Sequence, residues 1–291
     1  MPKASESHLD RLAAKARRNL ARRKSPRAGF STADAEALAS RYSTFESIPD
    51  AEGFVTESRL CIHRPDTPRP WLHLMTSNHD HVYGVMGSFC DVTGAGFLCY
   101  ETVLAGPVTS HKDNSYVPTA PRSTDVREFF LREEGKGKPA IWHMLPQVGR
   151  DSDQYSDYSA CYGLGWVSVE SACNGIHSQF RTFVPLDDTC EVWTITLTNL
   201  TGRARKLQLF ARVNWGLETY PSYYFDPRVV SEGRHLEDLR AIIALNNDKS
   251  NSLPRTGFMM SDAVFHGFDL SGEAFTGGGH YRPFPRAVVE G

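Results

Sequence analysis

A stretch of alternating apolar and polar side chains, CEVWTITLTNLTGRARKLQLFARVNW at residues 190–215, limits the possible folds of this chain most strongly. In its first half Trp193, Ile195 and Leu197 share one face, and the threonines between them share the other. After a glycine-containing turn at residues 199–202, the same period of two returns with Leu207, Leu209, Ala211, Val213 and Trp215. Alternation on both sides of a short turn predicts an antiparallel hairpin with one face in water.

Similar short runs, separated by Gly, Pro, Asn and Asp, continue through residues 52–291. The clearest are HVYGVMGSF, GFLCYETV, GLGWVSVES, SQFRTFVPL and RAIIALNN. Long helical periodicity is absent from this part of the sequence, and no repeat of fixed period is visible, which argues against a propeller. Many short strands without intervening helices indicate stacked antiparallel sheets. We therefore predict an all-β fold, a large antiparallel β-sandwich over residues 52–291.

The first part of the chain has a different composition. Residues 1–30 hold nine Lys and Arg against Glu6 and Asp10, and apolar residues recur there at helical spacing. This pattern predicts a short basic helix with one apolar stripe, within a basic N-terminal arm over residues 1–51. A solvated terminal helix is the simplest interpretation; a targeting segment or an arm that binds an acidic partner are alternatives, although acidic residues disfavour a transit peptide.

Charge and cysteine usage narrow the class of protein. The formal net charge of −2 gives no reason to expect nucleic acid or a membrane surface as a partner. No apolar run approaches the roughly 20 residues that span a bilayer, and no secretory signal is expected. The six cysteines, without CxxC spacing, are expected to be buried reduced thiols in a cytoplasmic protein. They are Cys61, Cys90, Cys99, Cys161, Cys173 and Cys190.

Three short segments could carry chemistry. Gly277–Gly279 could form a phosphate loop, but Pro283 and Pro285 follow and no Walker lysine is present, so a surface loop is expected. His79 and His81 would project to one side of a strand and could chelate a metal together with His63 or His73. Nothing fixes a third ligand, so we predict no metal site.

A third segment, GRDSDQYSDYSACYG, combines carboxylates with tyrosines. Asp151, Asp153 and Asp157 lie there between strand-like runs. Aromatic rings can stack on pyranose rings, and carboxylates accept hydrogen bonds from sugar hydroxyls. The segment is therefore either a sugar-binding loop or an ordinary solvated loop. A Ser/His/Asp triad has no GxSxG context to support it.

Five stretches, taken in order, give the chain a resemblance to a known family. They are TPRPWLHLMTSN (67–78), VREFFLREEGKGKPAIW (126–142), YSACYGLGWVSVES (158–171), FRTFVPLDDTCEVWTITLTNLTGRARKLQLFARVNWGL (180–217) and AFTGGGHYRPFPRAVVEG (274–291). Together they resemble the N-terminal domain of the cellobiose and chitobiose phosphorylases, glycoside hydrolase family 94. The resemblance implies a galactose-mutarotase-like supersandwich. It also implies that an (α/α)₆ barrel, absent from residues 1–291, would supply the catalytic acid and the phosphate-binding residues.

The resemblance further implies a role without catalysis. No catalytic residue is expected in this chain, and no cofactor, with inorganic phosphate as co-substrate of the complete enzyme. The expected partners are an (α/α)₆ catalytic domain or subunit, an oligosaccharide, and further copies in a homo- or hetero-oligomer. We expect a β-sandwich subunit or fragment of an inverting phosphorylase of β-linked gluco-oligosaccharides. It would form the dimer interface and, through Tyr158, Cys161, Tyr162 and Trp166, part of the substrate site.

Two alternatives remain open. The chain could be a free-standing carbohydrate-binding protein, or a mutarotase-like enzyme that uses a histidine acid and a glutamate base. His143, His177 and Glu170 are the available residues for the second alternative, although the sequence does not bring them together. Phe284, Ala287, Val288 and Val289 are expected to form an exposed apolar patch that a catalytic partner covers. The end of the sequence would then be the seam with that partner.

Overall fold

A computed structural model describes residues 36–37, 40–67, 71–77, 86–94, 96–100, 127–135, 137–147, 154–213, 215, 217, 231–246, 255–277 and 284–291. The chain divides into two compact units, Met1–Tyr42 and Ser43–Gly291. The basic helix predicted within residues 1–30 lies outside the described residues. All the strands given below belong to the second unit.

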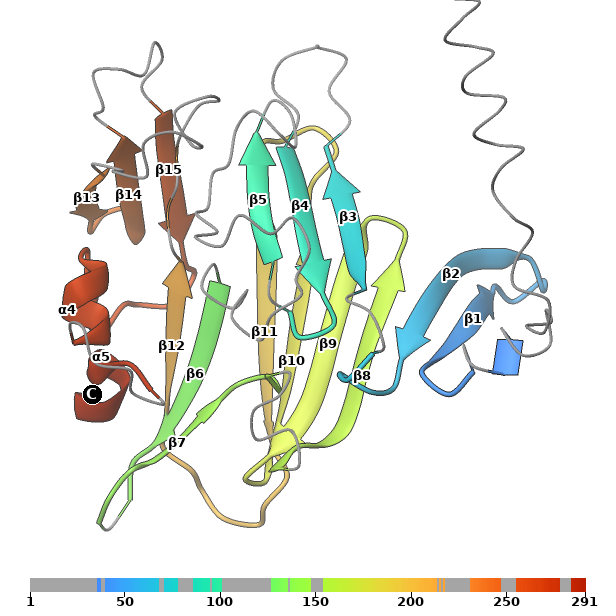
Figure 1. Ribbon diagram of the computed structural model, residues 1–291, viewed down its shortest axis with the longest axis horizontal. Coiled ribbons are helices and arrows are strands. Elements are labelled where there is room, and N and C mark those ends of the chain that lie inside the picture. The colour runs from blue at the N-terminus through green and yellow to red at the C-terminus, as the bar shows by residue number, and fades with distance from the viewer. Residues whose placement is uncertain are drawn as a thin grey trace, which may run out of the picture. The chain divides into compact units, whose positions relative to one another are not determined.

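The second unit is built of strands, with two short helices near its end (Figure 1). The strands are β1 Ser43–Pro49, β2 Val55–Ile62, β3 Leu72–Thr76, β4 Met86–Asp91, β5 Gly96–Tyr100, β6 Arg127–Glu133, β7 Ala140–His143, β8 Ser156–Gly163, β9 Trp166–Cys173, β10 Ile176–Phe183, β11 Val192–Asn199, β12 Leu207–Val213, β13 Ser231–Leu236, β14 Ala241–Asn246 and β15 Arg255–Met260. The helices are α4 Gly272–Thr276 and α5 Arg286–Glu290. The predicted all-β class is confirmed.

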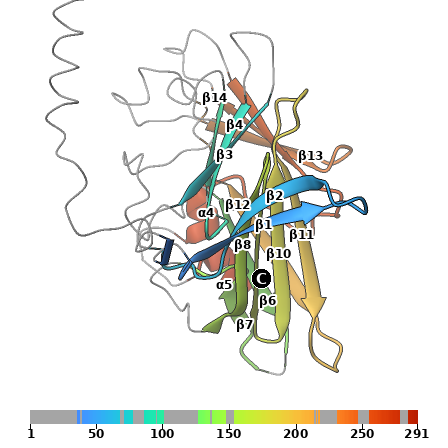
Figure 2. The ribbon, with the colours of Figure 1, turned by 90° about the vertical axis from the view of Figure 1, so that its right-hand side faces the viewer.

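The largest sheet has six antiparallel strands in the order β1-β2-β8-β9-β10-β11 (Figure 1), and its β1–β2 edge faces the viewer in Figure 2. Its central strands follow the period of two that the sequence predicts. In β10 the side chains of Ile176, Ser178, Phe180 and Thr182 are buried, and those between them are partly or fully exposed. One face of the sheet therefore belongs to the core, and the other meets solvent.

Three smaller antiparallel sheets complete the unit, with the strand orders β12-β6-β7, β3-β4-β5 and β13-β14-β15. The core joins the six-stranded sheet to the first two of these. Phe180 of β10 contacts Phe129 of β6 at 5.1 Å between ring centroids, and both belong to one buried cluster. Met75 of β3 and Trp142 of β7 belong to the same cluster. Burying each such large apolar side chain contributes about 1.5–3 kcal/mol, so this cluster holds the layers of the sandwich together.

The predicted hairpin at residues 190–215 is correct in its strands and wrong in its pairing. Trp193, Ile195 and Leu197 of β11 pack on the core, as their alternation predicts. However, β11 pairs with β10, whereas β12 pairs with β6 in another sheet. The connection at residues 200–206 crosses between layers, because both strands have an apolar face that must meet the same core.

The six-stranded sheet begins before the predicted domain boundary at residue 52. β1 pairs with β2 through seven residues, from Ser43 opposite Ile62 to Pro49 opposite Val55. The sequence of β1 shows no clear alternation, and its side chains are buried to different extents. This is because the strand lies at the edge of the sheet and pairs on one side.

The C-terminal segment corrects the prediction of an exposed apolar patch. Val288 is fully buried, and the Phe284 ring lies 5.5 Å from His143 of β7 and 6.5 Å from Phe130 of β6, between ring centroids. Val289 remains exposed. The apolar run therefore covers part of the β12-β6-β7 sheet within the chain itself, because α5 turns one face toward it.

Gly277 has a local structural role in this segment. It ends α4 in the left-handed conformation, with φ of 91°, and its N–H donates to the Glu273 carbonyl. Such a C-terminal glycine is a common helix stop, because it has no Cβ to clash in that conformation. Gly278, Gly279 and the residues up to 283 lie outside the described part.

The expectation of six reduced cysteines is wrong for two of them. Cys61 of β2 and Cys161 of β8 form a disulfide, with their Cα atoms 4.1 Å apart. They are direct partners in the strand register, which brings two cysteines 100 residues apart in sequence face to face. Cys90, Cys173 and Cys190 are free thiols, and the Cys99 side chain lies outside the described part. Burial raises the pKa of the Cys90 thiol to about 12, so it stays protonated.

Candidate functional site

The outward face of β8–β11 gathers side chains that can bind a polar ligand. Because opposite residues of antiparallel strands point to the same face, the register sorts these side chains into rows. The rows are Gly163, Trp166 and Phe183; Cys161, Ser168, Arg181 and Thr194; Ser159, Glu170, Gln179 and Thr196; and Ala172, His177 and Thr198. We call these residues the outer face.

A carboxylate, an imidazole and an amide meet in the middle of the outer face. Glu170 of β9 accepts a hydrogen bond from Gln179 Nε2 at 3.1 Å. The same carboxylate oxygen lies 3.8 Å from Nε2 of His177, one row further along β10. The side chains of Glu170 and His177 are 34% and 29% exposed, so both can reach a ligand from solvent. This group offers acceptors and donors within one short span of the sheet.

An aromatic ring and a guanidinium lie at one end of the outer face. The Trp166 ring lies over Gly163, where a Cβ atom would come within 2.1 Å of it, so only glycine fits there. Arg181 of β10 lies over the same ring, 4.6 Å from its centroid, in a cation–π contact. A sugar ring that stacks on the Arg181 side of Trp166 would have to displace this guanidinium.

The predicted substrate residues divide between the two faces of β8 and β9. Trp166 and Cys161 belong to the outer face, where Cys161 is bonded to Cys61. Tyr158 and Tyr162 point to the opposite face.

The two tyrosines are largely buried, and their hydroxyls have interior partners. Tyr158 donates a 2.5 Å hydrogen bond to the Val92 carbonyl, and Tyr162 donates a 2.9 Å hydrogen bond to the Trp71 carbonyl. Burial raises the pKa of both phenols. Their hydrogen bonds connect β8 to Trp71, directly before β3, and to Val92, directly after β4. In this chain the tyrosines therefore hold the layers together.

The three residues considered for a mutarotase-like reaction do not meet in one place. Glu170 and His177 lie together on the outer face. His143 is buried on β7, where its ring centroid lies 4.8 Å from that of Phe130. The alternation of HSQFRTF in β10 is a sequence signal that could have placed His177, Gln179 and Arg181 on one face. The residues of β9 and β11 that lie beside them are set by the long-range strand register, which the sequence does not show.

The other candidate motifs are only partly described. Asp157 adopts φ of 52° at an irregularity between β8 and β9, while Asp151 and Asp153 lie outside the described residues. His79 and His81 also lie outside. His63 accepts or donates a 2.8 Å hydrogen bond with the Thr44 hydroxyl. Within the described ranges, no group of three or more His, Cys, Asp or Glu side chains could hold a metal ion.

A buried ion pair below the sheet was not predicted from the sequence. Arg127 of β6 donates to both oxygens of Glu191, at 2.6 and 2.7 Å, and to the Gly94 carbonyl at 3.0 Å. Thr182 of β10 donates to the same carboxylate at 2.7 Å, and the Phe180 ring lies under the guanidinium. The pair therefore connects three sheets at their common core.

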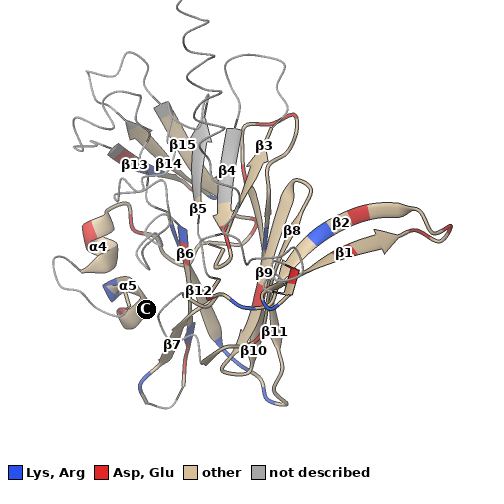
Figure 3. Ribbon diagram, turned by 45° about the vertical axis from the view of Figure 1, so that its right-hand side comes forward, with Lys and Arg blue, Asp and Glu red and all other residues tan. Residues whose placement is uncertain are grey.

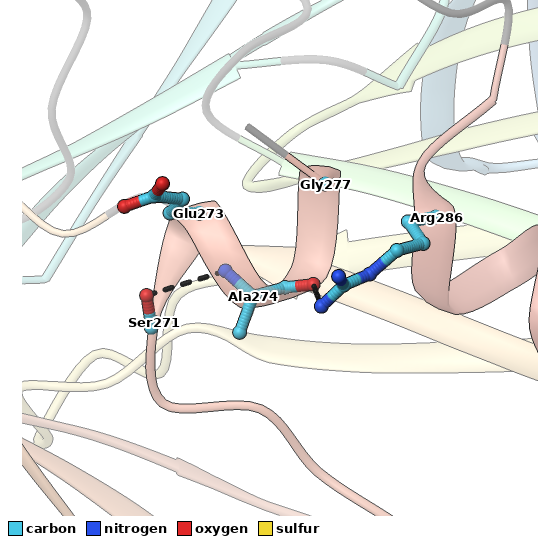
Figure 4. Close-up of a pocket in the computed structure, with 5 residues that line it drawn as sticks. All are labelled: Ser271, Glu273, Ala274, Gly277 and Arg286. Carbon is cyan, nitrogen blue, oxygen red and sulfur yellow. Dashed lines mark hydrogen bonds between the residues drawn. The ribbon is translucent and has the colours of Figure 1, made fainter. Parts of the chain in front are cut away.

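A shallow hollow lies beside α4 and is lined by Ser271, Glu273, Ala274, Gly277 and Arg286 (Figure 4). Ser271 accepts a hydrogen bond from the Ala274 N–H at 3.3 Å, and Arg286 donates to the Ala274 carbonyl at 3.0 Å. These bonds cap α4 and tie α5 to it, so the polar groups of the hollow serve the fold.

Comparison with known proteins gives a second line of evidence about the kind of protein to which this sandwich belongs. Residues 58–291 match the family described as glycosyl hydrolase 94, supersandwich domain. The solabiose phosphorylase of Paenibacillus borealis is 30% identical over 171 residues, which cover 57% of this chain and 21% of the relative. The N,N'-diacetylchitobiose phosphorylase of Vibrio proteolyticus is 24% identical over 157 residues, 53% of this chain and 18% of that protein.

These matches cover a small part of the relatives. The chain spans about a fifth of the length of the curated phosphorylases it matches. Among its described residues, no helix is long and apolar enough to cross a membrane.

Proposed function

Since the chain belongs to glycosyl hydrolase family 94 and carries its supersandwich domain, we propose that it is the non-catalytic β-sandwich of an inverting glycoside phosphorylase. The observation that supports this most directly is the match over residues 58–291, together with relatives that are named phosphorylases and of whose length the chain spans about a fifth. The reaction of the complete enzyme would be phosphorolysis of a β-linked gluco-oligosaccharide to a sugar 1-phosphate.

In this proposal an (α/α)₆ catalytic domain or subunit supplies the general acid and binds inorganic phosphate. The sandwich supplies the dimer interface and one wall of the substrate site, with no cofactor. The proposal includes the cytoplasmic location expected from the sequence.

We assign sugar contacts to the outer face. Glu170 and Gln179 present paired hydrogen-bonding groups that match vicinal sugar hydroxyls, and His177 adds a third. Arg181 and Trp166 supply a flat cationic and aromatic surface beside them. Of the substrate residues predicted from the sequence, Trp166 stays in this assignment.

The test is reconstitution with the catalytic partner. The chain, the barrel protein and their mixture are each given a panel of β-linked gluco-oligosaccharides and inorganic phosphate, and sugar 1-phosphate is measured. We expect product from the mixture alone, and full activity of the barrel protein by itself would overturn the proposal. A Glu170→Gln variant should raise the KM of the mixture for oligosaccharide. Glu237→Gln, an exposed carboxylate at the β13–β14 turn, serves as the matched control.

A second candidate function rests on the proximity of His177 and Glu170. Such a pair could act as acid and base in sugar anomerisation, as in a mutarotase-like enzyme. Polarimetry of freshly dissolved α-glucose with the purified chain tests this function. Acceleration that disappears in both Glu170→Gln and His177→Ala would favour it over the non-catalytic role.

A further inference from the structure

The β1–β2 hairpin is attached to the rest of the sheet by a short stretch of backbone pairing. β1 and β2 pair along their length, but β2 pairs with β8 at Leu60, Cys61 and Ile62 alone among the described residues. Residues 46–59 therefore extend beyond the part of β2 that pairs with β8, as a two-stranded ribbon (Figure 1).

The hairpin has its own local structure. The Asp50 carboxylate accepts hydrogen bonds from the backbone N–H groups of Glu52 and Phe54, at 3.1 and 2.8 Å, which shapes the turn. Arg59 forms a 2.8 Å ion pair with Glu46 across the two strands, and Figure 3 shows acidic and basic positions along β2. The two strands of the hairpin are therefore held to each other by contacts that do not involve β8.

The disulfide lies where β2 pairs with β8. Cys61 and Cys161 form the middle pair of the three residue pairs between β2 and β8. Cys61 is 2% exposed, whereas Cys161 is partly exposed on the outer face. Partly exposed disulfides exchange with small thiols more readily than buried ones, and attack would come from the Cys161 side.

We propose that Cys61–Cys161 is a reversible thiol–disulfide switch that fixes the β1–β2 hairpin to the sheet when oxidised and releases it when reduced. In the oxidised protein a covalent bond crosses the short β2–β8 contact. After reduction, the described backbone pairing of the hairpin with β8 is three residue pairs, beside the buried Ile62. The apolar side chains near its turn, Phe54 and Val55, are 72% and 60% exposed, so the turn end of the hairpin adds little apolar burial.

The chemistry needs a low-molecular-weight thiol and its disulfide, such as reduced and oxidised glutathione. A thiolate attacks Sγ of Cys161, the sulfur–sulfur bond breaks, and Cys61 leaves as a thiolate that takes a proton. A second thiol attacks the mixed disulfide, which frees the Cys161 thiol and forms the small-molecule disulfide. Two electrons and two protons pass to the protein, and oxidation reverses both steps.

The test uses the full chain equilibrated in glutathione buffers of graded ratio, followed by acid quench, alkylation and peptide mass spectrometry without reductant. We expect a linked peptide pair containing Cys61 and Cys161 in the oxidised buffers, and its reversible loss in the reduced ones. Absence of the linked pair under strongly oxidising glutathione would overturn the proposal.

Hydrogen exchange measures the structural effect of the switch. On reduction, amides of residues 55–62 should exchange about tenfold or more faster, while those of β9 and β10 stay unchanged. The Cys61→Ser/Cys161→Ser variant should match the reduced protein in every buffer. Cys190→Ser, which removes a free and partly exposed thiol, is the control and should keep the full response. Equal exchange of the hairpin in both redox states would contradict the switch even if the disulfide forms.

Discussion

Two charged clusters lie on opposite faces of the β8–β11 sheet and differ most in their access to water. On the inner face, the side chains of Arg127 and Glu191 are 3% and 1% exposed; Arg127 also donates to the Gly94 carbonyl, and Thr182 donates to Glu191. On the outer face, those of Glu170 and His177 are about a third exposed, and Glu170 accepts a hydrogen bond from the Gln179 amide. The inner cluster has the geometry of a structural connection, and the outer one that of a site open to ligands.

Breaking the inner cluster should have the largest effect. Glu191→Ala leaves the Arg127 charge buried without its partner, and we expect about 3–5 kcal/mol lower free energy of unfolding in urea denaturation. The double variant Arg127→Met/Glu191→Leu removes both charges and should recover most of that loss. A single variant as stable as the native chain would mean that Arg127 finds water in the folded state.

Gly94 tests the packing around the same cluster. Its φ is +79°, and a Cβ atom there would lie 2.7 Å from Leu145 Cδ1 and 3.2 Å from Phe180 Cδ1. Gly94→Ala should cost about 2–4 kcal/mol, from backbone strain and from this overlap. Gly53→Ala is the control, because Gly53 has φ of +90° with no atom within 4 Å of its Cβ position. The control should lose about 1 kcal/mol, from strain alone.

The contrast between the two faces was partly readable in the sequence. The alternation of Trp193, Ile195 and Leu197 with threonines identified the core face of β11, because a half-buried strand has a strict period of two. The same period in β10 separates Phe180 from Gln179 and Arg181. Local pattern therefore predicts which face a residue takes and the all-β class.

What local pattern could not give is the pairing of strands that are distant in sequence. The Cys61–Cys161 disulfide, the Arg127–Glu191 pair and the meeting of His177 with Glu170 depend on register or on crossing between sheets. The prediction of a β11–β12 hairpin was wrong for this reason, because a turn between two amphipathic strands is compatible with either a hairpin or a crossing between layers.

Glu133 is an intermediate case between the two clusters. Its carboxylate is 13% exposed and accepts hydrogen bonds from Arg205 of the β11–β12 connection, which lower the pKa of Glu133. The resulting stability is present above the unfolded pKa of about 4.5 and is lost as the pH falls through the lower folded value. We expect about 1 kcal/mol from this pair. In urea denaturation between pH 3 and 6, the free energy of unfolding of Glu133→Gln should fall less with decreasing pH than that of the native chain. An identical pH dependence in the two proteins would contradict the prediction.

The outer face should show the smallest effect on stability and a clear effect on binding. Glu170→Gln removes a charge that solvent screens, so the free energy of unfolding should change by less than about 0.5 kcal/mol. The same variant loses the best acceptor of the outer face, and oligosaccharide affinity in calorimetry should fall about tenfold. Gln179→Ala should behave alike, because the amide orients that carboxylate. If both variants lose stability and binding together, the outer face would be structural like the inner one; unchanged binding with unchanged stability would show that Glu170 does not contact sugar.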